Sequence, residues 1–285
     1  MEYLSSRLGI SFGTNNNLAL AGSTTTNLLA QVAAVSASTN LQTALFTVWS
    51  GANDFAASSA GTIDAAWGVV ISNAVMNITN AIGTLYTNSA REIIVGDLFN
   101  LTLTPLYNAI ATNSYSSNYA VLKVLQFNSE LGTAVTNLMQ SSPGLRIYFM
   151  DLYPEWQTVY GSPATYGFTV TLVGALQDTN VADKSFTGPG ANYLYWDTAH
   201  PTTKMHSMIG TLAYDLVGVG LNLTDSGTTL NLAVSNLYPG FLYTVQTSSN
   251  LLSWTNYDTI TAASRNQSLN VTNAPGPRAY YRVKY

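Results

Sequence analysis

The sequence contains no cysteine and only two histidines among its 285 residues. The lack of cysteine excludes disulfide bonds and thiolate chemistry, although it does not fix the cellular compartment. Charged residues make up only 8%, with ten basic and fourteen acidic side chains and a formal net charge of −4. No basic cluster is present, so nucleic acid is not expected as a partner. We also find no apolar run long enough to cross a bilayer and expect neither a membrane span nor a signal peptide at the start.

Hydrophobic residues are abundant, at 47%, and can form a substantial core. A chain of this length is suited to one large and one small domain. Because so few residues are charged, the polar surface must come from Asn, Thr, Ser and Gln. Surfaces of this kind resemble those of many secreted proteins, so we expect an extracellular location.

Up to about residue 220, short apolar runs alternate with longer segments of helical periodicity. The apolar runs are typical of strands buried on both faces: 44–49, 92–95 and 146–150. The helical segments between them are 64–87 and 116–140. This alternation predicts an α/β domain over residues 1–217, with a parallel sheet and helices on both of its sides.

A different pattern follows a predicted linker at 218–227. Residues 228–285 contain short alternating segments separated by turn residues: LNLAV, FLYTVQT, WTNYDTI, SLNVT and YYRVKY. They predict a small antiparallel β-sandwich, which resembles the fibronectin-like modules of secreted enzymes. Trp254 is able to stack on a sugar, but we favour a core or inter-strand position for it.

Both histidines lie in the stretch WDTAHPTTKMH, residues 196–206. Pro201 suits the first position of a helix, and apolar residues recur after it at helical spacing. His200 is therefore expected at the mouth of this helix. Asp197 is close enough in sequence for its carboxylate to reach one imidazole nitrogen, which leaves the other nitrogen free to act as a general base.

Two further stretches follow predicted strands. In WSGANDF, residues 49–55, Asn53 lies at the carboxyl end of a strand, where open α/β sheets bind ligands, and its amide is able to donate to a developing oxyanion. The alternative is a simple turn in which Asp54 caps the next helix. In NLALAG, residues 17–22, a short strand is expected to end at Gly22, where the missing side chain lets a ligand approach backbone N–H groups. An ordinary turn glycine is again the alternative.

Together these blocks resemble the GDSL, or SGNH, family of serine esterases and lipases. The resemblance covers residues 2–217, and the blocks follow the family's order: EYLSSRLGI, LALAG, GAND, IIVGDLFNLTLTP and YLYWDTAHPTTKMH. It implies a flavodoxin-like doubly wound parallel sheet, a Ser-His-Asp triad and hydrolysis of a small-molecule, lipid or polysaccharide ester without a cofactor. By this resemblance, His200 is the general base, Asp197 orients it, and the Gly22 N–H and the Asn53 side chain form the oxyanion hole.

The Gly-Asp-Ser motif that names the family precedes the matched region and is missing from this sequence. We therefore expect the first strand and its serine to be missing, and the chain alone to be a weak or inactive esterase. Gly96-Asp97-Leu98 mimics the motif without a serine, and Ser23 and Ser50 are interpreted as turn residues. A fragment of a longer esterase is the explanation we favour. A deliberately shortened chain, or a protein recruited to binding, are the alternatives.

Other chemistries have less support. His200 and His206 are six residues apart and no carboxylate cluster joins them, so no metal site is expected. Gly218-Val-Gly220 follows a helix and lacks the third glycine of a nucleotide-binding motif. The competing hypothesis is a non-catalytic secreted protein on a degenerate esterase fold, in which the former ester pocket or the C-terminal module binds a glycan or a lipid.

Overall fold

The computed structural model describes residues 1–285 except 11, 14–15, 36–40, 59–63, 111–116, 186, 226–229, 238, 272–278 and 285. The chain divides into two compact units, Met1–Ala213 and Tyr214–Tyr285. The helices are α1 (Glu2–Leu8), α2 (Thr25–Ala33), α3 (Ala52–Ala56), α4 (Asp64–Thr87), α5 (Pro105–Ile110), α6 (Ser117–Ser141), α7 (Leu152–Gly161) and α8 (Thr203–Val217). The strands are β1 (Leu45–Trp49), β2 (Glu92–Gly96), β3 (Arg146–Met150), β4 (Gly220–Asp225), β5 (Leu230–Ser235), β6 (Leu242–Ser248), β7 (Thr255–Thr261), β8 (Gln267–Val271) and β9 (Tyr280–Lys284).

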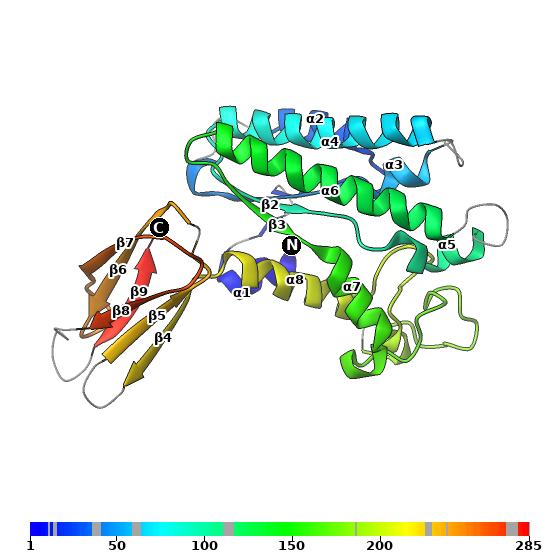
Figure 1. The fold of residues 1–285 in the computed structure, drawn as a ribbon. Coiled ribbons are helices and arrows are strands. Elements are labelled where there is room, and N and C mark those ends of the chain that lie inside the picture. Colours follow the sequence, from blue (N-terminus) through cyan, green and yellow to red (C-terminus); the bar gives the residue numbers. More distant parts are fainter. Residues whose placement is uncertain are drawn as a thin grey trace. The chain divides into compact units, whose positions relative to one another are not determined.

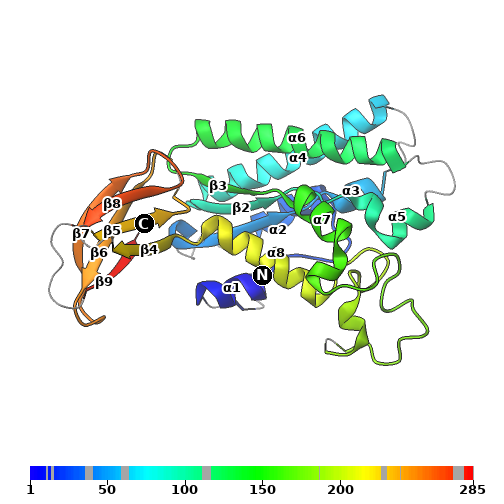
Figure 2. The same cartoon turned by 60° about the horizontal axis from the view of Figure 1, so that its bottom comes forward.

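The first unit is built on a parallel sheet in the order β1-β2-β3. All five residues of the central strand β2 are buried. This burial follows from the helices on both sides of the sheet: α2, α4 and α6 cover one face, and α1 and α8 the other (Figures 1 and 2). The predicted strands at 44–49, 92–95 and 146–150 and the predicted helices at 64–87 and 116–140 are confirmed.

Strand β1 is an edge of this sheet. Thr47 and Trp49 are exposed, and Val48 is its only buried residue. Within the described residues, β1 pairs with β2 and with no strand on its other side. The expected strand at 17–22 is wrong: residues 17–20 form no strand, and Leu20 is 68% exposed. The physical reason is that a strand needs partners for its N–H and C=O groups, and no described segment pairs with these residues.

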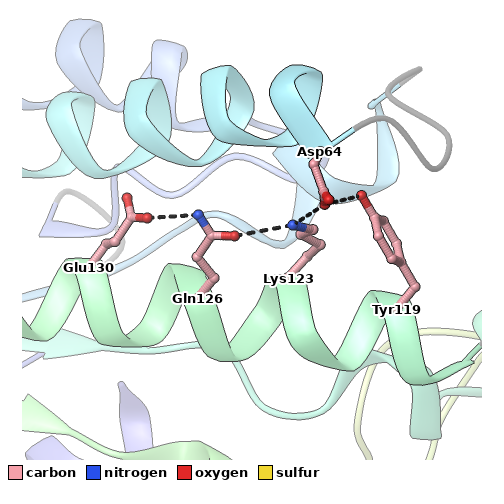
Figure 3. Close-up of polar contacts among 5 residues, drawn as sticks. All are labelled: Asp64, Tyr119, Lys123, Gln126 and Glu130. Atoms are coloured by element: carbon pink, nitrogen blue, oxygen red, sulfur yellow. Dashed lines mark hydrogen bonds and ion pairs between the residues drawn. The ribbon is translucent and has the colours of Figure 1, made fainter.

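A polar network on the surface joins α4 to α6 (Figure 3). Asp64 accepts a hydrogen bond from the Tyr119 hydroxyl and forms an ion pair with Lys123, both at 2.7 Å. Gln126 continues the chain by accepting from Lys123 at 3.3 Å and donating to Glu130 at 2.9 Å. The bond from Lys123, followed by that from Tyr119, holds the pKa of Asp64 below its usual value. Since Asp64 is exposed, the ion pair contributes little to stability.

Helix α4 is long and apolar enough to cross a membrane by length and composition alone, a feature that the sequence analysis did not expect. Its buried side chains recur every three or four residues: Trp67, Ile71, Ala74, Val75, Ile78, Ala81, Ile82 and Leu85. Core helices of globular domains meet the same criteria. Since α4 packs beside α2 and α6, its apolar face belongs to the core of the first unit (Figure 1).

The second unit contains two antiparallel sheets, ordered β4-β5-β8 and β7-β6-β9. They share one core, to which both sheets contribute buried side chains: Leu232, Val234, Leu237, Tyr243, Val245, Ile260, Ala262 and Val271. The expected linker at 218–227 is wrong over 220–225, which form β4; residues 226–227 lie outside the described residues. Pairing with β5 overrides the weak strand signal there, and Leu221 packs against the shared core.

Candidate active site

The structure brings Asp197 and His200 together. Nδ1 of His200 lies 2.7 Å from Oδ2 of Asp197, while Oδ1 of the same carboxylate accepts the backbone N–H groups of Ala199 and His200 at 2.8 and 2.7 Å. The turn and the imidazole are therefore oriented by one carboxylate. The His200 side chain is 74% exposed, and its Nε2 has no partner among the described residues. This geometry leaves Nε2 free to take a proton from a nucleophile.

Partial burial raises the pKa of Asp197, but the backbone N–H groups of His200 and Ala199 and the imidazole lower it further than burial raises it. The net effect is a pKa below the usual value. The carboxylate is thus charged at neutral pH, as a group that holds a histidine tautomer must be.

Helix α8 begins two residues later than expected. The Thr202 N–H donates to Leu194, and Pro201 forms a bridge with Tyr195, so the chain is still extended at these positions. The expectation that Pro201 occupies the first helical position is therefore wrong. His206 lies on the first turn of α8. Desolvation lowers its pKa, and the positive charges of the terminal amino group and of His200 add to this effect.

A second group forms around Asn53. Its Nδ2 donates to the Ser23 carbonyl at 2.9 Å, so the Asn53 side chain lies against the residue that follows Gly22. Gly22 adopts φ +75°, and among the described residues no atom beyond its chain neighbours lies within 4 Å of the place a Cβ would take. The Cβ side of Gly22 is therefore unobstructed, and its role as an oxyanion donor stays a prediction.

The Asp54 carboxylate connects the Asn53 region to Thr25 through hydrogen bonds. Asp54 lies within α3, and the alternative hypothesis, in which it caps a following helix, does not describe its contacts. Instead, Oδ2 accepts the Thr25 N–H at 2.9 Å and Oδ1 accepts the Thr25 hydroxyl at 2.7 Å. Asn77 of α4 donates to the same hydroxyl at 3.1 Å. Thr25 is fully buried at the start of α2. The sequence carries no local signal for this clamp, because Thr25 and Asp54 are 29 positions apart in the chain.

Two contacts tie the His200 loop to the carboxyl edge of the sheet. The Leu106 N–H of α5 donates to the Thr198 carbonyl at 2.8 Å, and Trp156 Nε1 of α7 donates to the Tyr195 hydroxyl at 3.0 Å. Both helices follow the carboxyl ends of strands, α5 after β2 and α7 after β3. Asn53 follows the carboxyl end of β1. A common crevice at that edge, in which Asn53 and His200 converge, stays a prediction.

Asp97 is a further buried carboxyl group at the same edge, and the sequence analysis noted it only as a motif mimic. It directly follows β2 and is 1% exposed. Its Oδ1 accepts the Leu152 N–H of α7 at 2.6 Å. Burial raises the pKa of Asp97 to about 8, against the hydrogen bond from Leu152, and the charge of Asp151 raises it further. An aspartate directly after an apolar strand was the available signal.

Neither candidate serine contacts the histidine. Ser23 Oγ accepts from Gln31 Nε2 at 3.4 Å, and no hydrogen bond joins Ser23 or Ser50 to His200 in the described part of the chain. Among those residues, no group of three or more His, Asp or Glu side chains is arranged to hold a metal ion. The interpretation of both serines as turn residues stays a prediction.

An α/β unit with an exposed, carboxylate-oriented histidine is typical of hydrolases that use general-base chemistry. The family model described as GDSL-like Lipase/Acylhydrolase matches residues 1–212, and the chain belongs to this family. Ester hydrolysis is thereby supported at the level of the family.

The curated relatives share low sequence identity with this chain. Two GDSL esterase/lipases of Arabidopsis thaliana are 24% and 26% identical over 147 residues each, 49% and 48% of this chain and 38% and 40% of theirs. The GDSL esterase/lipase EXL3 of the same plant is 27% identical over 94 residues, 30% of this chain and 26% of its own. The chain spans about two fifths or less of the length of these relatives.

Proposed function

We propose that the first unit supplies the base and the oxyanion donors of a carboxylic ester hydrolase, whose serine comes from a Gly-Asp-Ser segment outside residues 1–285. The 2.7 Å contact between Asp197 and His200 is the observation that carries this proposal. In the proposed reaction, His200 Nε2 takes the serine proton, Asp197 stabilises the imidazolium, and the Gly22 N–H and Asn53 Nδ2 bind the oxyanion.

The edge of β1 that no described strand pairs with supports a position for the proposed Gly-Asp-Ser segment. A parallel strand there would pair with β1 and cover its exposed edge. It would also offer a partner to residues 17–20. The Thr47 hydroxyl of β1 lies 3.0 Å from the sulfur of Met1, so an extension at the amino end would start beside that edge.

Ester hydrolysis by two proteins tests the proposal: the 285-residue chain and the same chain with an amino-terminal Gly-Asp-Ser strand. We expect little turnover from the first and clear turnover from the second. His200→Ala should remove most of the gained rate, on the order of 10⁴-fold or more. Asn53→Ala should cost roughly 10²–10³ in turnover, the effect of losing one oxyanion donor.

Two results would contradict the proposal. Robust turnover by the 285-residue chain that a serine-directed phosphonate blocks would place the nucleophile within it, with Ser23 and Ser50 as the first candidates. A folded extended chain without activity would favour the non-catalytic binding protein. Fibronectin-like identity of the second unit and secretion also stay proposals; the sandwich topology and the composition support them.

A further inference from the structure

The turn between β6 and β7 exposes two leucines. Leu251 is 55% and Leu252 86% exposed. Leu251 has φ +63°, a left-handed conformation that residues other than glycine seldom adopt. Two exposed apolar side chains, one of them on a strained backbone, indicate a surface that contacts another molecule.

This turn, residues 248–254, contains four hydrogen bonds between side chains and backbone. Ser248 Oγ accepts the N–H groups of Asn250 and Leu251 at 3.2 and 2.9 Å. Asn250 Oδ1 accepts those of Leu252 and Ser253, both at 2.9 Å. Four backbone N–H groups therefore donate to two side-chain oxygens, and these bonds fix the backbone of the turn that exposes the leucines.

Trp254 and Arg282 lie next to this turn. Trp254 Nε1 donates to the Leu251 carbonyl at 3.2 Å, and the Arg282 guanidinium lies 4.3 Å from the Trp254 ring centre. Arg282 Nε donates to Gln246 at 2.8 Å. Tyr280, two residues before Arg282 on β9, is 38% exposed. No described carboxylate forms an ion pair with Arg282.

We propose that the 248–254 turn binds an anionic lipid surface, with Leu251 and Leu252 in the acyl region and Arg282 against the phosphates. Leucines at a tip with Trp and Tyr behind them match the polarity gradient of a bilayer interface. The alternative that Trp254 stacks on a sugar has less support, because Arg282 already covers one face of the ring.

The charge distribution agrees with this assignment. The second unit has four basic and three acidic residues, whereas the first has six basic and eleven acidic. Attraction to anionic lipid therefore comes from the second unit. Two leucines bury less apolar surface than one acyl chain, so binding should be weak and reversible.

Co-sedimentation of the full chain with vesicles tests the proposal. Vesicles of phosphatidylcholine are compared with vesicles that also contain phosphatidylserine, and we expect stronger partitioning into the second. Leu252→Ser should lower the partition coefficient about tenfold. Arg282→Gln should reduce the preference for anionic vesicles about fivefold. Leu242→Ser is the matched control, since Leu242 is 62% exposed at the other end of β6 and should not matter.

Three outcomes would overturn the proposal: no sedimentation of the wild-type chain, unchanged binding by Leu252→Ser, or an equal loss with Leu242→Ser. Retention on a polysaccharide matrix with no vesicle binding would assign the surface to a glycan instead. The test does not depend on ester hydrolysis, because His200→Ala should sediment as the wild type does. Circular dichroism of each variant checks that the fold is intact.

Discussion

The Asp197 carboxylate holds His200 by both of its oxygens, Oδ2 to the imidazole Nδ1 and Oδ1 to the backbone N–H, at 2.7 Å each. A charged carboxylate accepts a hydrogen bond from Nδ1–H and so selects the tautomer in which Nδ1 carries the proton and Nε2 does not. Nitrogen-15 NMR of the neutral imidazoles should show this tautomer for His200. Asp197→Asn should weaken the preference, because an amide can donate to Nδ1. His206 is an internal control that should not change. The opposite tautomer in the wild-type protein would contradict the assignment of His200 as base.

The Asp54–Thr25 clamp predicts a loss of stability. Asp54→Ala leaves the Thr25 N–H and hydroxyl without their acceptor in a fully buried position. We expect the free energy of unfolding of the first unit to fall by about 1–3 kcal/mol, measured by urea denaturation. The matched control, Asp64→Ala, removes an exposed carboxylate and should cost less. Equal losses for the two variants would show that the clamp is unimportant.

The buried Asp97 carboxyl predicts how stability depends on pH. Its pKa rises from 3.8 to about 8 on folding, so the folded state keeps a proton that the unfolded chain has released. The stabilisation is complete below about pH 4 and is lost as the pH rises to about 8. Asp97→Asn resembles the protonated carboxyl and still accepts from Leu152. It should flatten the profile between pH 4 and 8 and stabilise at pH 8, by an amount on the order of a few kcal/mol. If thermal melts show the same dependence of stability on pH for the wild type and for Asp97→Asn, the raised pKa of Asp97 is refuted.

Gly51 is required for two reasons. Its φ is +127°, and a Cβ there would lie 2.9 Å from Cζ of Phe127. Gly51→Ala should therefore destabilise the first unit by about 1–3 kcal/mol in denaturant titration. Gly68→Ala, in α4 with open space at its Cβ, should instead stabilise by about 0.5–1 kcal/mol. If Gly51→Ala leaves the free energy of unfolding unchanged, the backbone after β1 adjusts to the added Cβ without cost.

Local pattern determined most of the secondary structure. Helix α4 lies where apolar residues at a period of 3.6 predict it, and strands β1, β2 and β3 lie where short continuous apolar runs predict them. The Asp197–His200 contact was also predictable, because the two residues are only three positions apart in one turn. Contacts between residues that are close in the chain can therefore be predicted from their spacing.

Long-range pairing decided the rest. Residues 17–20 have the apolar character of a strand but form none, whereas 220–225 form β4 despite a weak signal. A strand exists only if another segment satisfies its hydrogen bonds, and no local pattern records that partner. The Asp54–Thr25 clamp likewise joins residues that are 29 positions apart. The raised pKa of Asp97 depends on burial and on Asp151, 54 positions away. These features arise from desolvation and packing, which only the tertiary structure sets.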